Sequence, residues 1–457
     1  MSRVFLLSTN VTVEPYPVYP LGMAVLAGAL TQKGHEVCQF DFLAAGRDMN
    51  RLRCELATFN PDVVGLSLRN IDNVDSFSGE KGWYLDQARD QVCAIREATR
   101  APVVVGGGAF SILPEKILEY LGVDYGIVGE GENALCDLLD RLRAGIKIPP
   151  LIFGHGSSPG ENQMGPPLYN KEVADFYIRE SGQINLQTKR GCPFACAYCT
   201  YPSLEGSRVH CRDPRAVVDD LEGIRRDFPG ARVFFTDSVF NDPEGRYLAL
   251  IEEMVRREVG ISWCGFFRPS GMGRSELALL KRSGLYALEL GTDAASDATL
   301  EGLNKGFTFA EVLRFNADCL AEELPCAHFI IFGGPGETSQ TVTEGLENIA
   351  ALGPSVVFVF AGIRIFPGSP LCERAQNEGI IQAGQSLLKP VYYFSPTVDP
   401  RVMNERIIRS FKGLRNRIFP PSEGQMRLNV MHDFGFRGIL WDRLVSFRSK
   451  GSCRRKT

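Results

Sequence analysis

Three cysteines crowded into eight residues constrain this chain more than any other feature. Cys192, Cys196 and Cys199 follow the spacing C-x3-C-x2-C. The residues before them, 184–188, alternate apolar and polar side chains like a short strand, and residues 189–191 turn the chain into the loop. Three thiolates in one tight loop can bind a [4Fe–4S] cluster and leave its fourth iron open to a small molecule.

A structural zinc site is the first alternative for the same cysteines. Structural zinc takes four ligands, and beside the cysteines of the loop a further pair of Cys or His residues is expected, separated from each other by only a few residues. Here only His210 and Cys211 follow the loop, and they form no such pair. We therefore favour the cluster over zinc, and both over a disulfide.

The composition excludes several classes of protein. The chain has 457 residues, which is enough for two or three domains, with 44% hydrophobic and 23% charged residues and a net charge of −4. This charge gives no reason to expect nucleic-acid binding. The longest apolar run, 356–366, is interrupted by Arg364, so we expect no membrane span. Residues 1–7 are predicted to be a buried strand and not a signal peptide.

The cysteines also indicate a compartment. The chain has 13 of them without the regular spacing of a disulfide framework. Free core thiols and an oxygen-sensitive cluster both require a reducing environment, so we expect the protein in the cytoplasm.

Residues 1–145 alternate strands and helices. Strands are predicted at 4–7, 36–42, 62–68, 102–105 and 125–128, with amphipathic helices between them. This alternation predicts a doubly wound, Rossmann-like parallel sheet, whose ligand lies beyond the carboxyl ends of the strands. The residues at these ends are rich in glycine, which also occurs in ordinary tight turns.

Residues 146–180 are rich in proline and glycine and are predicted to be a linker, with a helix-like stretch at 171–178. The strand–helix alternation then resumes over 181–375. Six strands are predicted, at 185–188, 231–236, 261–267, 287–290, 327–332 and 356–365. Six strand–helix units favour a partial (β/α)6 barrel over an eight-fold one. Residues 376–457 are predicted to be a C-terminal extension, and its aromatic segment, 387–395, is expected either to close the substrate cavity or to pack on the surface.

The cysteine loop, with Tyr198 before its last cysteine, resembles that of the radical S-adenosylmethionine (SAM) superfamily. The resemblance covers roughly residues 180–375. It implies that Cys192, Cys196 and Cys199 bind a [4Fe–4S] cluster, that the amino and carboxylate groups of SAM chelate the open iron, and that Tyr198 lies beside the adenine. No catalytic residue is assigned beyond these cluster ligands.

The resemblance also implies SAM contacts at the strand ends. Asp237 and Ser238 would contact the SAM amino group, although Thr236-Asp237-Ser238 departs from the Gly-Gly-Glu-like run usual there. Arg268 would pair with the SAM carboxylate, since a guanidinium binds carboxylates in a bidentate fork. Glu289 would accept hydrogen bonds from the ribose, and the backbone of Gly333 and Gly334 would support the adenine. Strand-end Asp and Arg residues also commonly cap the next helix.

Residues 1–145 resemble the cobalamin-binding domain of class B radical SAM methyltransferases. The resemblance rests on Pro20-Leu21-Gly22 and on the glycine-rich strand ends. It implies a cobalamin site made by Ser67, Leu68, Asn70, Gly106, Gly107, Gly108, Gly129, Glu130, Gly131 and Glu132. The Asp-x-His-x-x-Gly motif, whose histidine binds cobalt in cobalamin mutases, is missing, so we expect no histidine ligand. A domain that has lost its cofactor is the alternative.

The resemblance implies a cobalamin-dependent radical SAM enzyme. We expect methyl transfer to an unactivated carbon of a small-molecule, natural-product or lipid substrate through a 5′-deoxyadenosyl radical, with a flavodoxin or ferredoxin as electron donor. Radical rearrangement or cyclisation is one alternative, and a non-enzymatic cobalamin sensor is another. Methylthiolation would need an additional cluster, and the N-terminal domain has no three-cysteine set for one. The low charge and the aromatic extension hint at an apolar or aromatic substrate.

Overall fold

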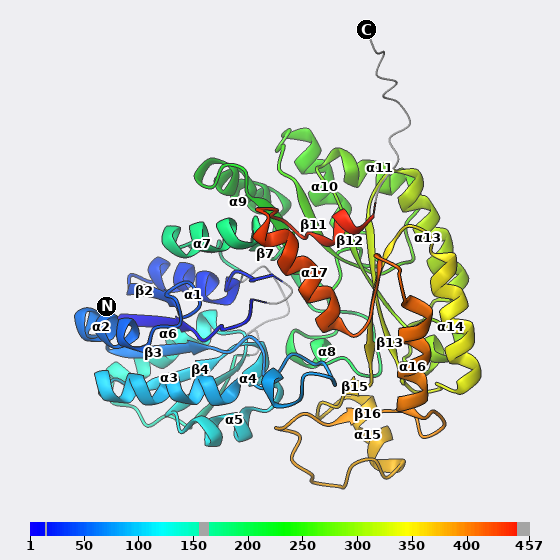
Figure 1. Cartoon of the computed structure of the whole chain (residues 1–457). Helices are drawn as coiled ribbons and strands as arrows, with labels where there is room; N and C mark the ends of the chain where they lie inside the picture. The colour runs from blue at the N-terminus through cyan, green and yellow to red at the C-terminus, as the bar shows by residue number, and fades with distance from the viewer. Residues whose placement is uncertain (14–15, 155–163, 446–457) are drawn as a thin grey trace.

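Two parallel β-sheets, each flanked by helices, make up most of the computed structural model (Figure 1). The structure describes residues 1–13, 16–154 and 164–445. The first sheet has six strands in the order β2-β1-β3-β4-β5-β6, and the second has seven in the order β17-β14-β13-β12-β11-β10-β7. The expected α/β class, with a doubly wound sheet before a partial barrel, is confirmed.

The four central strands of the first sheet, β1, β3, β4 and β5, are mostly buried on both faces, whereas the edge strands β2 and β6 are partly exposed. The elements of this sheet are β1 (Arg3–Ser8), α1 (Leu21–Gln32), β2 (Glu36–Asp41), α2 (Met49–Phe59), β3 (Val63–Ser67), the 3₁₀ helix η1 (Gly79–Gly82), α3 (Leu85–Ala98), β4 (Val103–Gly106), α4 (Gly108–Ile112), α5 (Pro114–Leu121), β5 (Tyr125–Gly129), α6 (Glu132–Arg143) and β6 (Leu151–Gly154). Helices cover both faces, as the apolar runs in the strands require. The strand order reverses beside β1, and ligands of such sheets bind at this reversal.

The second sheet curves into an incomplete barrel. Its elements are α7 (Lys171–Ser181), β7 (Gln183–Leu186), β8 (Lys189–Arg190), α8 (Tyr201–Leu204), β9 (His210–Cys211), α9 (Pro214–Asp227), β10 (Arg232–Phe235), α10 (Tyr247–Arg256), β11 (Trp263–Phe267), α11 (Arg274–Arg282), β12 (Leu288–Asp293), α12 (Asp297–Gly302), α13 (Phe309–Ala321), β13 (Cys326–Phe332), α14 (Ser339–Ala351) and β14 (Val356–Ala361). All six predicted barrel strands are present. Their outward side chains, such as Val233 and Trp263, pack on the helices.

The chain after β14 adds a seventh strand to the incomplete barrel and fills part of its interior. The elements of this part are β15 (Ile363–Arg364), α15 (Pro370–Asn377), β16 (Tyr392–Tyr393), α16 (Pro400–Phe411), β17 (Arg417–Ile418), α17 (Pro421–Asp433) and the 3₁₀ helix η2 (Trp441–Leu444). Strand β17 pairs with β14 as a seventh strand, which the sequence pattern did not predict because only two residues pair. Trp441 is buried in one apolar cluster with Phe234, Cys264 and Phe358, side chains of the barrel strands.

Two segments differ from the sequence-based expectation. Residues 151–154, expected in a linker, form β6 and pair in parallel with β5, so the first sheet extends past residue 145. The expected strand 356–365 is split in two, because Gly362 has a φ of +74° and the chain turns there from β14 to β15. The domain bounds given above otherwise remain predictions.

The loop after β3 ties the first sheet to the barrel. In this loop, Asp72 accepts a hydrogen bond from Arg364 Nε at 2.9 Å, and both side chains are almost completely buried. The other guanidinium nitrogens donate to the carbonyl oxygens of Ile365 and Leu387, each at 2.7 Å. Every charged group of this pair therefore has a partner, as a buried ion pair requires.

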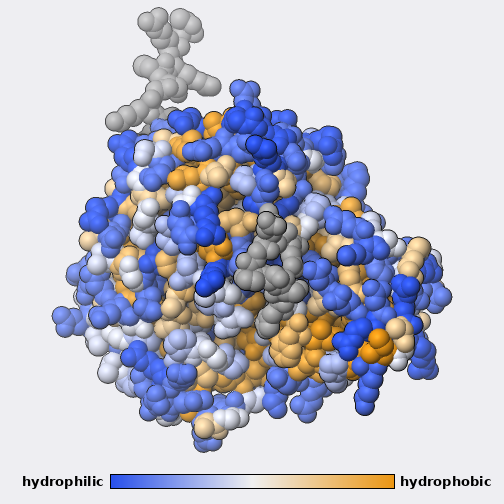
Figure 2. Space-filling model, turned by 180° about the vertical axis from the view of Figure 1, so that it is seen from behind, coloured by the Kyte–Doolittle hydropathy of each residue, from blue (hydrophilic) through white to orange (hydrophobic). Residues whose placement is uncertain are grey.

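No helix in the described part of the chain is both long and apolar enough to cross a bilayer. Hydrophilic residues cover much of the face in Figure 2, and hydrophobic ones gather in smaller areas between them.

We expect Asp72→Ala to destabilise the protein by about 3–5 kcal/mol, because it leaves the Arg364 charge buried without its partner. The urea midpoint of unfolding, followed by circular dichroism, measures the effect. The matched control is Glu172→Ala, which breaks an exposed pair with Arg51 and should cost at most about 1 kcal/mol. Equal midpoints for the two variants would contradict the assignment.

Candidate functional site

The cysteine loop leaves the barrel directly after the short strand β8. Gly191 has a φ of +90°, and an added Cβ would lie 1.9 Å from the carbonyl oxygen of Arg208, so only glycine fits at this turn. The backbone N–H of Cys192 donates to Gly206 at 3.1 Å, and that of Cys199 donates to Cys196 at 3.1 Å. The loop is therefore folded around its own cysteines.

A three-residue segment after α12 holds the loop from the other side. The backbone N–H of Ala197 donates to the carbonyl oxygen of Leu303 at 2.9 Å, and Asn304 Nδ2 donates to the carbonyl oxygen of Ala195 at 2.7 Å. The ammonium group of Lys305 lies 3.6 Å from Cys196 Sγ. We call residues 303–305 the loop clamp.

Asp293 connects the loop clamp to the predicted adenine contact. Its carboxylate accepts hydrogen bonds from Tyr198 Oη and Lys305 Nζ, both at 2.5 Å. Asp293 has a φ of +62°, and the β12–β13 register shifts between Gly291 and Asp293. Burial opposes the charge of Lys305, but the nearby Asp293 and Cys196 outweigh this effect and raise the pKa of the ammonium group.

The three thiols suit a cluster better than a single ion. Burial raises the pKa of Cys192 and raises that of Cys199 to about 12, so ionised sulfurs need positive charge beside them. Within the described ranges, no three His, Cys, Asp or Glu side chains are arranged to hold one metal ion. A four-iron cube does not require such convergence, because each cysteine binds a different iron.

Arg268 lies beside the same loop. Its guanidinium carbon is 4.1 Å from the ring centre of Phe194 and 4.6 Å from that of Phe307. Its Nη2 donates to the carbonyl oxygen of Lys305, and its Nε donates to Ser270 at 3.1 Å. The side chain is thus fixed next to the cysteines, although its role as partner of the SAM carboxylate remains a prediction.

Asp237 and Ser238 have partners within the protein. The Asp237 carboxylate accepts from the backbone N–H groups of Thr188 and Lys189 and from the Thr188 hydroxyl. Ser238 donates to Glu205 at 2.9 Å, and the same Glu205 oxygen accepts from Gly191 N–H at 3.2 Å. Both residues thus hold the start of the cysteine loop, and their contact with SAM stays a prediction.

Gly333 and Gly334 lie at the end of β13, under the aromatic extension. Gly333 has a φ of +90°, its N–H donates to Glu337 at 3.1 Å, and its carbonyl oxygen accepts from Ser395 N–H at 2.8 Å. An added Cβ on Gly333 would lie 2.8 Å from the Phe394 ring. The extension therefore packs on the predicted adenine-supporting segment.

Glu289 lies deeper in the barrel than the other candidates. One of its oxygens accepts from Tyr16 Oη at 3.2 Å and from Trp441 Nε1 at 3.0 Å, so three separate parts of the chain meet there. Burial raises the pKa of Glu289 to about 7. Its neighbour across the strands is Phe266, whose ring contacts Phe234 inside the barrel and is still 41% exposed. This depth weakens the case for Glu289 as a ribose contact, which remains a prediction.

The predicted cobalamin residues line the carboxyl edge of the first sheet. Gly107 has a φ of +101°, and an added Cβ would lie 2.4 Å from the Leu68 carbonyl oxygen, whereas one on Gly108 would meet open space. A pocket beside them is lined by Thr9, Asn10, Val11, Thr12, Leu68, Arg69, Asn70 and Tyr84. Open backbone and a pocket at the strand-order reversal fit a large cofactor such as cobalamin.

Two of the predicted cobalamin residues are engaged elsewhere. Glu132 and Glu130 form ion pairs with Arg190 of β8, at 2.5 Å and 3.2 Å. We call the carboxyl edge of the first sheet, where these glutamates lie, the cobalamin edge. The two ion pairs join it to the strand that leads into the cysteine loop. Their carboxylates serve this junction, so their direct contact with cobalamin remains a prediction, as do the contacts of Ser67, Gly106, Gly129 and Gly131.

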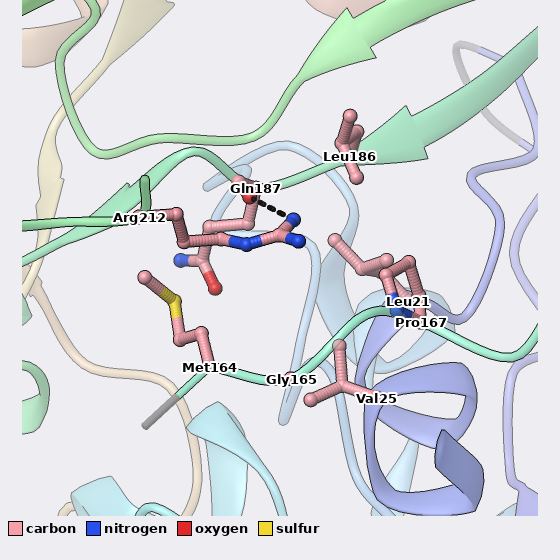
Figure 3. Close-up of a pocket in the computed structure, with 8 residues that line it drawn as sticks. All are labelled: Leu21, Val25, Met164, Gly165, Pro167, Leu186, Gln187 and Arg212. Atoms are coloured by element: carbon pink, nitrogen blue, oxygen red, sulfur yellow. Dashed lines mark hydrogen bonds between the residues drawn. The ribbon is translucent and has the colours of Figure 1, made fainter. Parts of the chain in front are cut away.

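A second pocket lies between α1 and the end of β7 (Figure 3). Arg212 reaches across it and donates to the carbonyl oxygen of Gln187 at 3.3 Å. The other residues that line it are Leu21, Val25, Met164, Gly165, Pro167 and Leu186. None of the predicted site residues lines this pocket.

Several residues of the site were not predicted from the sequence. Lys305 and Arg190 contact the loop or its neighbours, and Arg69 lies in the first pocket between the predicted Leu68 and Asn70. A lysine in the turn Leu303-Asn304-Lys305-Gly306 was the available signal for the clamp. Nothing in the spacing indicates that this turn meets a loop more than 100 residues earlier.

Comparison with known families agrees with this geometry. Residues 8–139 match the family model described as B12 binding domain, and residues 186–349 match the Radical SAM superfamily. The structure of the radical SAM methyltransferase TsrM from Kitasatospora setae, with cobalamin and a [4Fe–4S] cluster bound, superposes with a TM-score of 0.84. The two sequences are 25% identical, and the match covers 97% of each chain. The chain is a radical SAM protein with a B12-binding domain.

Curated relatives of this radical SAM protein include two carbon methylases. The tryptophan 2-C-methyltransferase of Streptomyces laurentii is 26% identical over 431 residues, which cover 77% of this chain and 71% of the relative. The hopanoid C-3 methylase of Methylococcus capsulatus is 27% identical over 303 residues, 63% of this chain and 55% of the relative. The expected family, the enzyme class and the cofactors [4Fe–4S], SAM and cobalamin are confirmed.

The titration of Glu289 gives a prediction with a definite sign. With a folded-state pKa of about 7 against an ordinary 4.5, the folded protein keeps this proton when the unfolded chain has lost it. The contribution of this bound proton to the free energy of unfolding is fully present below pH 4.5 and is lost as the pH rises through 7. Relative to Glu289→Gln, the wild type should lose about 3 kcal/mol of unfolding free energy between pH 4.5 and 8.

Urea unfolding of the two proteins at several pH values measures this difference. Glutamine still accepts hydrogen bonds from Tyr16 and Trp441, so the fold should persist. Glu344→Gln, at an exposed position of α14, is the control and should show no such trend. A wild type and a Glu289→Gln variant with parallel pH profiles would refute the buried titration.

Proposed function

We propose that this protein is a cobalamin-dependent radical SAM methyltransferase that methylates a carbon atom of a small molecule. The observation that carries the proposal is that the cysteine loop and the cobalamin edge belong to one junction. Arg190, two residues before Cys192, pairs with Glu130 and Glu132 at the cobalamin edge. Helix α8, directly after the loop, contacts α4, which begins at Gly108.

This proximity matters because the chemistry requires two cofactors near one substrate. When bound, the reduced cluster would supply the electron for radical cleavage of SAM, and cobalamin would supply a methyl carrier. Cys192, Cys196 and Cys199 would hold the cluster, with the loop clamp fixing their spacing. The glycine-rich edge around Gly107 would hold cobalamin, and the chain around the junction would exclude water from the reacting groups.

The substrate would enter the barrel from the same junction. Phe266, Phe329 and Phe360 face inward and are not fully buried, and the buried carboxyl group of Glu289 lies on the strand next to Phe266. An apolar or aromatic molecule fits these walls best. Two relatives are named for tryptophan and for hopanoids, which are mainly apolar molecules. These names support an apolar or aromatic substrate for this chain without identifying the molecule.

An electron donor and a reducing compartment complete the proposal. The cluster needs a low-potential electron, which a flavodoxin or ferredoxin carries. The 12 cysteines in the described part of the chain are all free thiols, as expected in the cytoplasm. No nucleic-acid partner is proposed.

The test is anaerobic purification with cobalamin supplied, followed by iron and cobalt analysis and incubation with SAM labelled in its methyl group. We expect about four irons and one cobalt per chain. Transfer of the label from SAM, first to the cobalamin and then to a product in extracts of the producing cell, supports methyl transfer. Cys196→Ala should lose iron while retaining cobalt, because the two cofactors occupy different domains.

Cyclisation is the second candidate, because the anaerobic magnesium-protoporphyrin IX monomethyl ester cyclase of Rubrivivax gelatinosus is 23% identical over 354 residues. A cyclase would consume SAM without incorporating its label into the product. Iron without cobalt, even after supplementation, would refute the cobalamin-dependent mechanism.

A further inference from the structure

Lys305 is a buried cation that touches a cluster cysteine. Its side chain is only 7% exposed. The ammonium nitrogen lies 3.6 Å from Cys196 Sγ and 2.5 Å from the Asp293 carboxylate. Lys305 was not among the predicted cluster or SAM contacts, and a lysine at a surface turn would not be buried in this way.

The position of Lys305 is fixed from several sides. Its backbone oxygen accepts from Arg268, and its backbone N–H donates to Leu300 at 2.9 Å. Asp293, which pairs with the ammonium group, is held in turn by Tyr198 of the cysteine loop. The ammonium group therefore cannot swing into solvent without breaking a closed ring of contacts from Cys196 through Lys305 and Asp293 to Tyr198.

Next to Asp293, the strand end is anchored by a buried polar network. Thr292 Oγ1 lies 2.9 Å from His328 Nδ1, and His328 Nε2 lies 3.1 Å from Asn316 Oδ1. Burial lowers the pKa of His328 to about 3, so the imidazole stays neutral and acts as a spacer. This network fixes the backbone that carries the Asp293 carboxylate.

Charge this close to a cluster ligand affects electron transfer. A one-electron reduction adds one negative charge to the cluster and its thiolates. A buried cation stabilises the reduced state more than the oxidised one, and hydrogen bonds to cluster sulfurs raise the reduction potential. A carboxylate paired with that cation has the opposite effect, since it cancels part of the positive charge.

We propose that Lys305 is a positioning residue that sets the reduction potential of the cluster through Cys196, with Asp293 as its counter-charge. The proposal rests on the cluster of the proposed function. It concerns the uptake of one electron, supplied in the cell by the flavodoxin or ferredoxin donor, and requires neither cobalamin nor a substrate.

The first test is a potentiometric titration of the reconstituted cluster, with dithionite as reductant and the reduced cluster detected by electron paramagnetic resonance. Lys305→Met should shift the equilibrium toward the oxidised cluster about tenfold, which is about 59 mV for one electron. Lys305→Arg keeps the positive charge and should stay closer to the wild type. Lys281→Met removes a half-exposed lysine of α11 and serves as the control.

The second test predicts a shift of the opposite sign. Asp293→Asn removes the counter-charge, so Lys305 acts on Cys196 unopposed and the potential should rise. A purely structural role would lower the cluster content of both variants without moving their potentials in opposite directions. If Lys305→Met fails to bind the cluster, the sign of the Asp293→Asn shift decides alone.

The outcomes separate this proposal from the proposed function. Lys305→Met with a full cluster and the wild-type potential would overturn the role of Lys305, and so would an Asp293→Asn potential that is unchanged or lower. Either result would leave methyl transfer by the wild type untouched. A wild type that binds no iron would instead refute the cluster and both proposals with it.

Discussion

The fold around the candidate site depends on one constraint: three neighbouring sulfurs, of Cys192, Cys196 and Cys199, must be held together where they can ionise. Burial raises the pKa of Cys192 and Cys199, so the thiolates need positive charge from the metal and from the protein. The loop clamp places the ammonium group of Lys305 beside Cys196. It also makes two hydrogen bonds to the backbone of the loop, at Ala195 and Ala197. The barrel strands matter here because they bring residue 305 to a loop more than 100 residues earlier.

The junction between the two sheets follows from the same requirement. Radical chemistry requires a site from which water is excluded. If that site lies between two domains, their contacts must hold them in a fixed relative position. Buried ion pairs serve this purpose on two sides of the junction, at Arg190 with Glu132 and at Arg364 with Asp72. Such pairs give precise geometry more than net stability, because desolvation offsets much of their attraction.

The barrel interior shows how one scaffold serves different substrates. Glu289 connects the N-terminal segment, through Tyr16, with the C-terminal extension, through Trp441. These three side chains shape the floor of an otherwise aromatic interior. Relatives of this chain include methylases of tryptophan and of hopanoids and a porphyrin cyclase, so the shared fold does not by itself specify a substrate.

The sequence by itself predicted most of the strands and helices and a set of three cysteines as the cluster ligands. Hydrophobic periodicity is local, so it located the βα units, and C-x3-C-x2-C identified Cys192, Cys196 and Cys199 because one tight loop needs all three. The strand β17 and the split at Gly362 were missed, because two-residue strands and a single positive φ leave no periodic signal. Only the tertiary structure decided that Glu130 and Glu132 pair with Arg190, that Glu289 lies on the barrel floor and that Lys305 reaches Cys196. These are contacts between residues distant in the chain, and their partners are set by how the strands and helices pack.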